Sequence, residues 1–193
     1  MQTVIIASLA FIIQLIGVSL YIRSMMRGEA KPNRVSWAIW ALGPIIGVWL
    51  QWKVESGLYL LPVFMAGFNP IIVVVASFLI KKGYWEIKKF DVYCGILAIL
   101  SLFLWATTQN LFLSIAFAIA SDLLAGIPTL YKSWKYPESE NPSAYIGGGI
   151  ANILGLSIIK DYNFSTLSFG LYLVILNVVI VLGIYRKKIF KIA

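Results

Sequence analysis

Histidine is absent from this chain of 193 residues, and cysteine occurs only once, as Cys94. A single cysteine cannot form an internal disulfide, and without histidine there is no Cys and His cluster for a metal ion. The sequence also lacks the G-x-S-x-G, P-loop and CxxC patterns that mark hydrolase, nucleotide and redox sites. We therefore expect neither an enzyme nor a bound cofactor, and we expect Cys94 to be an apolar packing residue.

Charged residues are scarce as well, at 12% of the sequence against 60% hydrophobic residues. A soluble domain of this size could not bury so much apolar surface. A membrane-spanning helix needs about 20 mainly apolar residues. Runs without any charged side chain cover residues 1–22, 35–52, 56–80, 92–121, 141–159 and 162–185. The sequence therefore predicts an all-α membrane protein.

The run from residue 92 to 131 contains Asp122 as its only charged residue. As one helix, rising about 1.5 Å per residue, it would be roughly twice as long as the hydrocarbon layer is thick. It must therefore fold back, and the polar segment TTQN at 107–110 is the expected reversal. This gives seven expected transmembrane helices. Residues 1–22 are expected to be the first of them rather than a cleaved leader.

The basic residues predict the orientation in the membrane. With seven helices, 14 of the 16 Lys and Arg residues fall in the loops 23–34, 81–91 and 132–142 and in the C-terminal tail. Short loops rich in Lys and Arg stay cytoplasmic. The expected location is the cell's inner (plasma) membrane, with the N-terminus outside and the C-terminus cytoplasmic. The net charge of +8 follows from this rule and from attraction to anionic lipid, so no nucleic-acid partner is expected.

The chain can be aligned with itself, without a gap, so that the first three predicted helices fall on the last three. This repeat alignment superposes Asn69 with Asn177, Gln14 with Asp122, and Trp37 with Tyr145. Identities are few and apolar segments match partly by chance, so the residues alone leave a true repeat open. Topology favours it, because one linker helix between two triplets orients both the same way. The expected units are a first triple-helix repeat over 1–90, a linker helix over 91–109 and a second, parallel repeat over 110–193.

Asp122 is expected near the middle of the membrane. It lies 12 residues from Asn110 and 10 from Lys132, or roughly 18 Å and 15 Å along a helix. A charge there costs at least ~2.5 kcal/mol, so the group must face a polar cavity, have a partner or be protonated. No Lys or Arg is expected at that depth. Asp122 is therefore a candidate for proton coupling, and the alternative is a protonated side chain that links two helices.

Three asparagines, Asn69, Asn152 and Asn177, are expected at similar depth on the third, sixth and seventh helices. Amides in hydrocarbon need hydrogen-bond partners. They serve either as links between helices or as ligands for a polar solute. The pair Asn69 and Asn177, at one depth on repeat-related helices, favours a shared central binding site, which Gln14 would join.

Aromatic residues suggest a path to that site. Trp37, Trp40 and Tyr145 lie one turn inside the cytoplasmic boundary and are candidates to line it. The other tryptophans are expected at the membrane interfaces as an aromatic belt; they are Trp49, Trp52, Trp85, Trp105 and Trp134.

Prolines and acidic loop residues complete the set of candidates. Pro44 and Pro128 each remove a hydrogen bond from a helix interior, so they are either hinges or static kinks. Glu138 and Glu140, in the segment YPESEN, are the nearest approach to an acidic pair. Both are expected to be solvated loop residues.

In layout and motifs the chain resembles the PQ-loop/SWEET (MtN3-like) transporter superfamily. The resemblance includes the 3+1+3 order, the end of the fifth helix, IPTLYKSW, the polar loop KYPESENPS and the mid-depth asparagines. Pro128 and Thr129 stand where the family has Pro-Gln. The resemblance implies that Asn69 and Asn177 correspond to paired pocket asparagines, and that Asp122 corresponds to the aspartate of proton-coupled members.

The function expected from these features is transport of a small polar solute by alternating access, with lipid as the surroundings. Sugar-like, amino-acid-like and cationic solutes stay open, whereas a free anion is disfavoured because no intramembrane cation is expected. The alternative is a non-transporting membrane receptor or assembly factor on the same fold. Assembly into a homo-oligomer is also left open.

Overall fold

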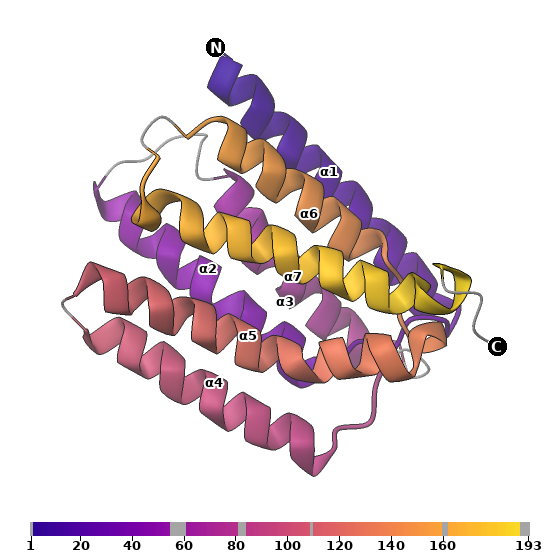
Figure 1. Ribbon diagram of the computed structural model, residues 1–193. Helices are drawn as coiled ribbons and strands as arrows, with labels where there is room; N and C mark the ends of the chain where they lie inside the picture. Colours follow the sequence, from indigo (N-terminus) through magenta and orange to yellow (C-terminus); the bar gives the residue numbers. More distant parts are fainter. Residues whose placement is uncertain (1, 55–60, 81–83, 109, 160–161, 190–193) are drawn as a thin grey trace.

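The computed structural model describes residues 2–54, 61–80, 84–108, 110–159 and 162–189. Within these ranges the chain forms seven α-helices, one short 3₁₀-helix and no strand, which confirms the expected all-α class. Figure 1 shows the long helices side by side in one bundle. The elements are α1 (Gln2–Met26), α2 (Arg34–Val54), α3 (Leu61–Leu79), α4 (Lys89–Thr107), α5 (Leu111–Lys135), η2 (Pro137–Ser139), α6 (Ser143–Ser157) and α7 (Phe164–Ile189).

Four helices in the described part of the chain are long and apolar enough to cross a membrane. They are Gln2–Met26, Lys89–Thr107, Ile115–Lys135 and Thr166–Ile189, and Phe64–Leu79 is a shorter apolar helix. Large apolar side chains stand exposed along their outer surfaces, for example Ile16, Phe103 and Ile175, each more than half exposed. Apolar surface of this extent suits contact with lipid. These features indicate a membrane protein.

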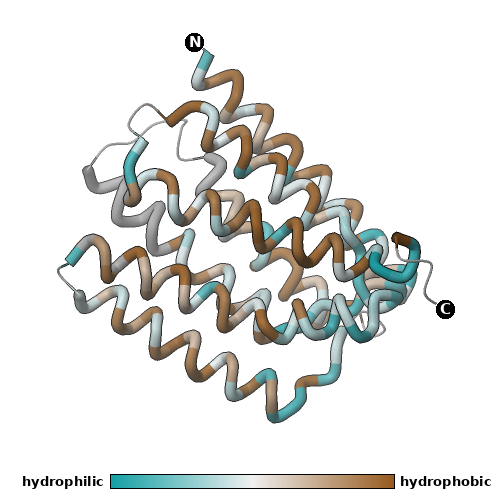
Figure 2. The backbone as a smooth tube through the Cα atoms, in the orientation of Figure 1, coloured by the Kyte–Doolittle hydropathy of each residue, from teal (hydrophilic) through white to brown (hydrophobic). Residues whose placement is uncertain are grey.

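Polar residues collect at one end of the bundle, where α1, α5 and α7 end (Figure 2). We call it the basic end, and the end that carries the N-terminus the opposite end. The last turns of these helices supply Arg23, Lys132, Lys135, Arg186, Lys187 and Lys188. The described chain therefore begins at the opposite end with α1 and finishes at the basic end with α7.

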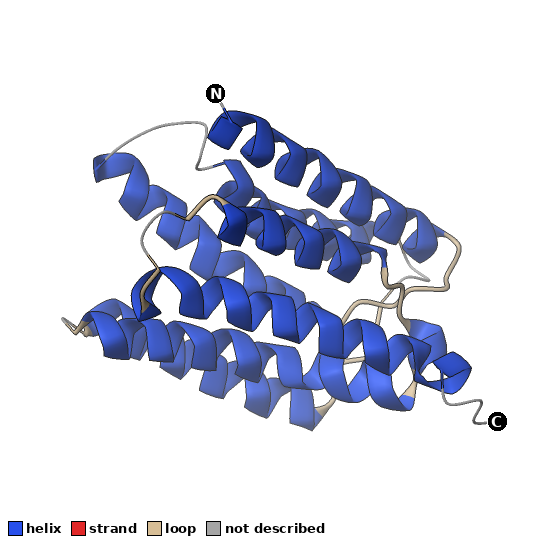
Figure 3. Cartoon of the chain, turned by 45° about the horizontal axis from the view of Figure 1, so that its top comes forward, coloured by secondary structure: helices blue, strands red, loops and turns tan. Residues whose placement is uncertain are grey.

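The first three helices pack against one another in the same pattern as the last three. The helix α3 packs against both α1 and α2, and α7 packs against both α5 and α6. Between the halves, α1 packs against α6 and α5 packs against α2, while α4 lies against α5 and α2. Figure 3, in which the bundle is turned so that its top comes forward, shows the long helices running in roughly one common direction.

The contact between α1 and α6 is made by backbone against backbone, at a place we call the glycine seam (Gly17 and Gly147). A Cβ atom added to Gly17 would stand 2.8 Å from the backbone oxygen of Ser143 and 3.3 Å from the Cα atom of Gly147. A Cβ atom added to Gly147 would stand 3.1 Å from the oxygen of Ile13. Only glycine permits so close an approach, as at other tight helix crossings in membranes.

The contact between α2 and α5 is made by side chains, at a place we call the aromatic seam (Ile39, Trp40, Asp122, Ala125 and Gly126). Ile39 and Ala125 are buried in one apolar cluster with Ala98 of α4. The indole nitrogen of Trp40 donates a hydrogen bond of 3.1 Å to the backbone oxygen of Asp122. The ring of Trp40 also lies 3.3 Å from the position of a Cβ atom on Gly126. The helices at this seam are thus joined through an indole ring.

Asparagine side chains define where helices begin. The chain reverses between Thr107 and Leu111, as expected, and Asn110 accepts a hydrogen bond of 3.1 Å from the backbone of Leu113 at the start of α5. At the basic end, Asn33 accepts from Val35 at 3.1 Å. Asn141 likewise accepts a hydrogen bond of 3.0 Å, from the backbone of Ser143 at the start of α6. Such bonds satisfy amide donors that a helix start leaves free.

Candidate functional site

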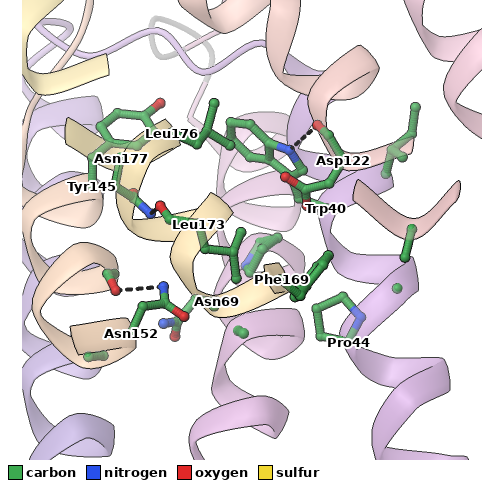
Figure 4. Close-up of a pocket in the computed structure, with 18 of the residues that line it drawn as sticks. Trp40, Pro44, Asn69, Asp122, Tyr145, Asn152, Phe169, Leu173, Leu176 and Asn177 are labelled. Carbon is green, nitrogen blue, oxygen red and sulfur yellow. Dashed lines mark hydrogen bonds between the residues drawn. The ribbon is translucent and has the colours of Figure 1, made fainter. Parts of the chain in front are cut away.

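A cavity of about 480 Å³ lies inside the bundle, between the two halves of the chain (Figure 4). Side chains from all seven helices line it. Nine of the ten residues that the sequence singled out are among them: Gln14, Trp37, Trp40, Pro44, Asn69, Asp122, Tyr145, Asn152 and Asn177. The tenth, Pro128, is not. The helices therefore bring together residues that are far apart in the sequence.

The three asparagines differ in how their amides are used. The side-chain nitrogen of Asn152 donates to the backbone oxygen of Gly148 at 2.8 Å, and that of Asn177 donates to Leu173 at 2.8 Å. Each bond reaches back one turn of its own helix and fixes the orientation of the amide. The side-chain oxygen of Asn69 is buried and has no partner among the described residues. A buried acceptor of this kind is a natural place for a ligand donor.

Asp122 is held from two sides. Its carboxylate oxygen Oδ2 accepts a hydrogen bond of 2.8 Å from the hydroxyl of Tyr172 on α7. Its backbone oxygen accepts the bond from Trp40 on α2, drawn in Figure 4. The one ion pair among the described residues lies elsewhere, so no Lys or Arg of the described chain pairs with Asp122. The carboxyl group instead connects α5 with α7 through a neutral donor, and the backbone oxygen of the same residue connects α5 with α2.

Tyr172 was not among the residues predicted from the sequence. It lies in the charge-free run 162–185, five residues before Asn177 and on the same helix. A phenol in a membrane span needs a polar partner for its hydroxyl. The need of its hydroxyl for a partner, together with the lone carboxyl group of Asp122, could have identified Tyr172 from the sequence.

Aromatic rings form a layer at the side of the cavity that faces the basic end. The ring centroids of Trp37 and Trp40 are 5.5 Å apart, and those of Trp37 and Tyr145 are 5.9 Å apart. Tyr21, which the sequence did not single out, adds a fourth ring at 5.1 Å from Trp37. Tyr21 has no exposed surface and Trp37 and Tyr145 have almost none. This layer, with Met25 beneath it, closes the cavity on that side.

A buried ion pair lies directly beyond the aromatic layer. Lys132, on α5, contacts Glu140 with Nζ and Oε1 2.7 Å apart, and both side chains are almost fully buried. The other carboxylate oxygen of Glu140 accepts from the hydroxyls of Tyr21 at 2.9 Å and Tyr145 at 3.3 Å. The expectation of a solvated Glu140 is therefore wrong, because the loop folds back over α5. Glu138, two residues earlier, is exposed as expected.

Pro128 lies apart from the cavity, and one of the tryptophans expected at the membrane interfaces lines it. Pro128 is fully buried and lines a smaller hollow of about 290 Å³ at the basic end, together with Trp85 and Lys132. Trp105, expected in the aromatic belt, lines the main cavity near its opposite end. Trp134 is more than half exposed and carries the guanidinium of Arg186 over its ring. The side chains of Trp49 and Trp52 lie outside the described residues.

The lining of the cavity carries one acidic group and, among its described residues, no basic one. Polar atoms come from the asparagines, Gln14, Ser121 and Asp122, and the rest of the wall is aliphatic or aromatic. No group of three His, Cys, Asp or Glu side chains forms within the described part of the chain. The site can therefore donate and accept hydrogen bonds, stack against rings and compensate one positive charge.

Comparisons with known proteins return no match: no model of a known family, no curated protein and no solved structure resembles the chain closely enough to be reported. The functional reading of the site consequently depends on its geometry and chemistry.

Proposed function

We propose that the protein is a membrane transporter that moves a small polar solute by alternating access. The observation that carries this proposal is the central cavity, with amides from both halves of the chain, a lone carboxyl group and a closed aromatic layer on one side. Ligand sites between helices of a bundle have this composition, mostly apolar with a few placed polar groups. In transporters built from repeats, such a site lies midway through the membrane.

The transporter would have seven spans in a 3+1+3 order, as two parallel repeats joined by α4. The helix order supports this, because α3 and α7 each pack against the other two helices of their triplet. The contacts between the halves support it too. The repeat alignment carries α1 onto α5 and α2 onto α6, so the contact of α1 with α6 corresponds to the contact of α5 with α2. The repeat alignment carries Asn33 onto Asn141, and both side chains accept from the backbone two residues later. This arrangement is that of the PQ-loop/SWEET superfamily, in which we place the chain as a divergent member.

The basic end would face the cytoplasm of a cell bounded by its inner (plasma) membrane. The reason is the concentration of Lys and Arg at the ends of α1, α5 and α7, since loops and helix ends of that composition remain on the cytoplasmic side. The C-terminus would then be inside and the N-terminus outside.

The solute would be neutral and polar, zwitterionic or cationic. A free anion would meet the carboxyl group of Asp122 and, in the described lining, no cation to offset the repulsion. Asn69 would bind through its unpartnered oxygen, and Asn152 and Asn177 through the oxygens that their bonds to the backbone leave available. Trp37, Trp40 and Tyr145 would supply flat surfaces for stacking.

Asp122 would couple the movement of solute to that of a proton. Its carboxyl group accepts the hydrogen bond from Tyr172, so a change in its charge alters the contact between α5 and α7, while the backbone oxygen of the same residue is held by Trp40 of the first half. A screen of sugars, amino acids and organic cations by thermal shift at two pH values tests this role in the wild type and in Asp122→Asn. We expect the variant to lose the pH dependence of the shift. Full retention of that dependence would contradict proton coupling.

Labelling with a thiol reagent that cannot cross membranes tests the transport cycle itself. Asn177→Cys, in a Cys94→Ala background without other cysteines, should react from both sides of the membrane, because the cavity opens alternately. Val178→Cys is the matched control, since Val178 is the next residue and stands 48% exposed on the outer surface of α7. That control should react from neither side. If Asn177→Cys reacts from neither side, the result would favour a static receptor or assembly factor.

A further inference from the structure

The ion pair between Lys132 and Glu140 ties together several segments of the chain at the basic end. The ammonium group of Lys132 donates to the backbone oxygens of Lys31 and Ser139 as well as to Glu140. Glu140 in turn accepts from Tyr21 on α1 and Tyr145 on α6. The network therefore joins the loop after α1 to α5, and the loop after α5 to α1 and α6.

The position of this network relative to the cavity suggests what it does. Tyr145 lines the cavity and also binds Glu140, so one side chain touches both. Lys132, Tyr21 and Met25 have no exposed surface, and Glu140 is 7% exposed. A route from the cavity to the basic end past Tyr21 and Tyr145 therefore meets the pair of Lys132 and Glu140.

A buried ion pair is a poor choice for stability alone. Removing two charges from water is expensive, and apolar residues of similar volume often stabilise a protein equally well. A pair whose separated members regain water on opening is suited to a structure with two states, because hydration offsets the lost contact. The pair also has no counterpart in the first half of the chain, since the repeat alignment carries Lys132 onto Ser24 and Glu140 onto Pro32.

We propose that the pair of Lys132 and Glu140, braced by Tyr21 and Tyr145, is the latch that holds the cavity closed toward the basic end. The inference rests on the proposed transport function and adds the residues that govern one of its two gates. Opening separates the loop after α1 from the loop after α5 and exposes the central site to the side of the basic residues. The gate at the opposite end works without this ion pair.

The experiment compares two double variants with the same change in formal charge. Lys132→Met with Glu140→Gln removes the latch but leaves an amide oxygen for the two tyrosines. Lys135→Met with Glu138→Gln is the matched control, because both residues are exposed and lie on the same helix and loop. The reporter is Ala151→Cys in the Cys94→Ala background, since Ala151 lines the cavity and is small. Two vesicle preparations of defined orientation present either the basic end or the opposite end to an impermeant thiol reagent.

We expect the latch variant to label at least tenfold faster than the wild-type background from the basic end, and slower from the opposite end. The control variant should label at the background rate. Equal rates in all three proteins, with measurable labelling from both ends, would overturn the latch and leave the transport proposal standing. No labelling from the basic end in any of them would overturn both.

A milder variant guards against loss of folding. Tyr21→Phe removes one hydroxyl that binds Glu140 and keeps the buried volume. It should raise the labelling rate from the basic end several-fold while the protein remains monodisperse. An unchanged rate in this variant, in folded protein, would also count against the latch.

Discussion

The two contacts between the halves of the chain differ in kind, although the proposed repeat makes them equivalent. At the glycine seam, the backbones of α1 and α6 approach until no Cβ atom fits between Gly17 and Ser143. At the aromatic seam, an indole ring separates α2 from α5 and makes the hydrogen bond to Asp122. The repeat alignment places Gly17 on Ala125 and Ile39 on Gly147, so larger side chains stand at the aromatic seam.

This difference between the two seams indicates where the bundle has room for a solute. Neither glycine of the glycine seam lines the cavity, whereas three of the five residues of the aromatic seam do, namely Ile39, Trp40 and Asp122. Close backbone packing resists sliding, because every displacement meets a carbonyl group or a Cα atom. Side chains can change rotamer, so the aromatic seam is the one that adapts when the helices move.

The largest effect is expected for Gly17→Ala at the glycine seam. The new methyl group would stand 2.8 Å from a backbone oxygen, which cannot move without moving α6. We expect a loss of about 2 to 3 kcal/mol in the free energy of unfolding, the upper range for overpacking. Thermal unfolding in detergent measures it.

Gly43→Ala is the control for that substitution, because nothing lies within 4 Å of a Cβ atom at Gly43. It should leave the stability unchanged or raise it by up to about 1 kcal/mol, since alanine favours a helix over glycine. Losses of equal size at Gly17 and Gly43 would show that the α1–α6 crossing is not specially tight.

A smaller effect is expected for Trp40→Phe at the aromatic seam. The substitution removes the indole donor whose bond to Asp122 is 3.1 Å long, while a ring remains between the helices. The expected loss is about 1 kcal/mol, the usual net worth of a hydrogen bond in a protein. Trp134→Phe, on an exposed ring of the basic end, should change the unfolding temperature far less. Equal changes of the unfolding temperature in the two variants would contradict the role assigned to the indole nitrogen of Trp40.

The smallest effect is expected for Gly126→Ala, the counterpart of Gly17→Ala on the aromatic seam. Its methyl group would meet Trp40 at 3.3 Å and Leu176 at 3.6 Å, both of which are side-chain contacts. These side chains can yield by a few tenths of an ångström, and alanine gains helix propensity, so the net change should stay within about 0.5 kcal/mol. A loss of stability as large as that of Gly17→Ala would show that the two seams do not differ in how they tolerate an added methyl group.

Several features of the fold could be predicted from the sequence because they depend on local patterns. The reversal between α4 and α5 is an example, since only TTQN interrupts a run too long for one helix. The gathering of Asn69, Asp122, Asn152 and Asn177 around one cavity could also be anticipated, because polar groups at one depth in a bundle have few other places to go.

Other features depend on contacts between distant segments, which no local pattern reveals. Glu140 lies in a loop with the composition of solvated loops, and only the approach of Lys132 and Tyr21 makes it buried. The glycine seam is of the same kind: Gly147 belongs to the run GGG at 147–149, which is typical of close helix packing, but nothing in that run identifies Gly17 as its partner. Tyr172 was missed because nothing in α7 alone distinguishes its hydroxyl from that of an interfacial tyrosine.

The burial of Lys132 has a chemical consequence. Among the Lys and Arg side chains whose surroundings the structure describes, only that of Lys132 is buried, whereas the side chains of Lys88, Lys89, Lys135, Lys187 and Lys188 are exposed. An amine-directed acylating reagent should therefore modify those five within its intrinsic reaction time and spare the sixth. The rate at which an acyl group appears on Lys132 would then measure how often water reaches the interior from the basic end.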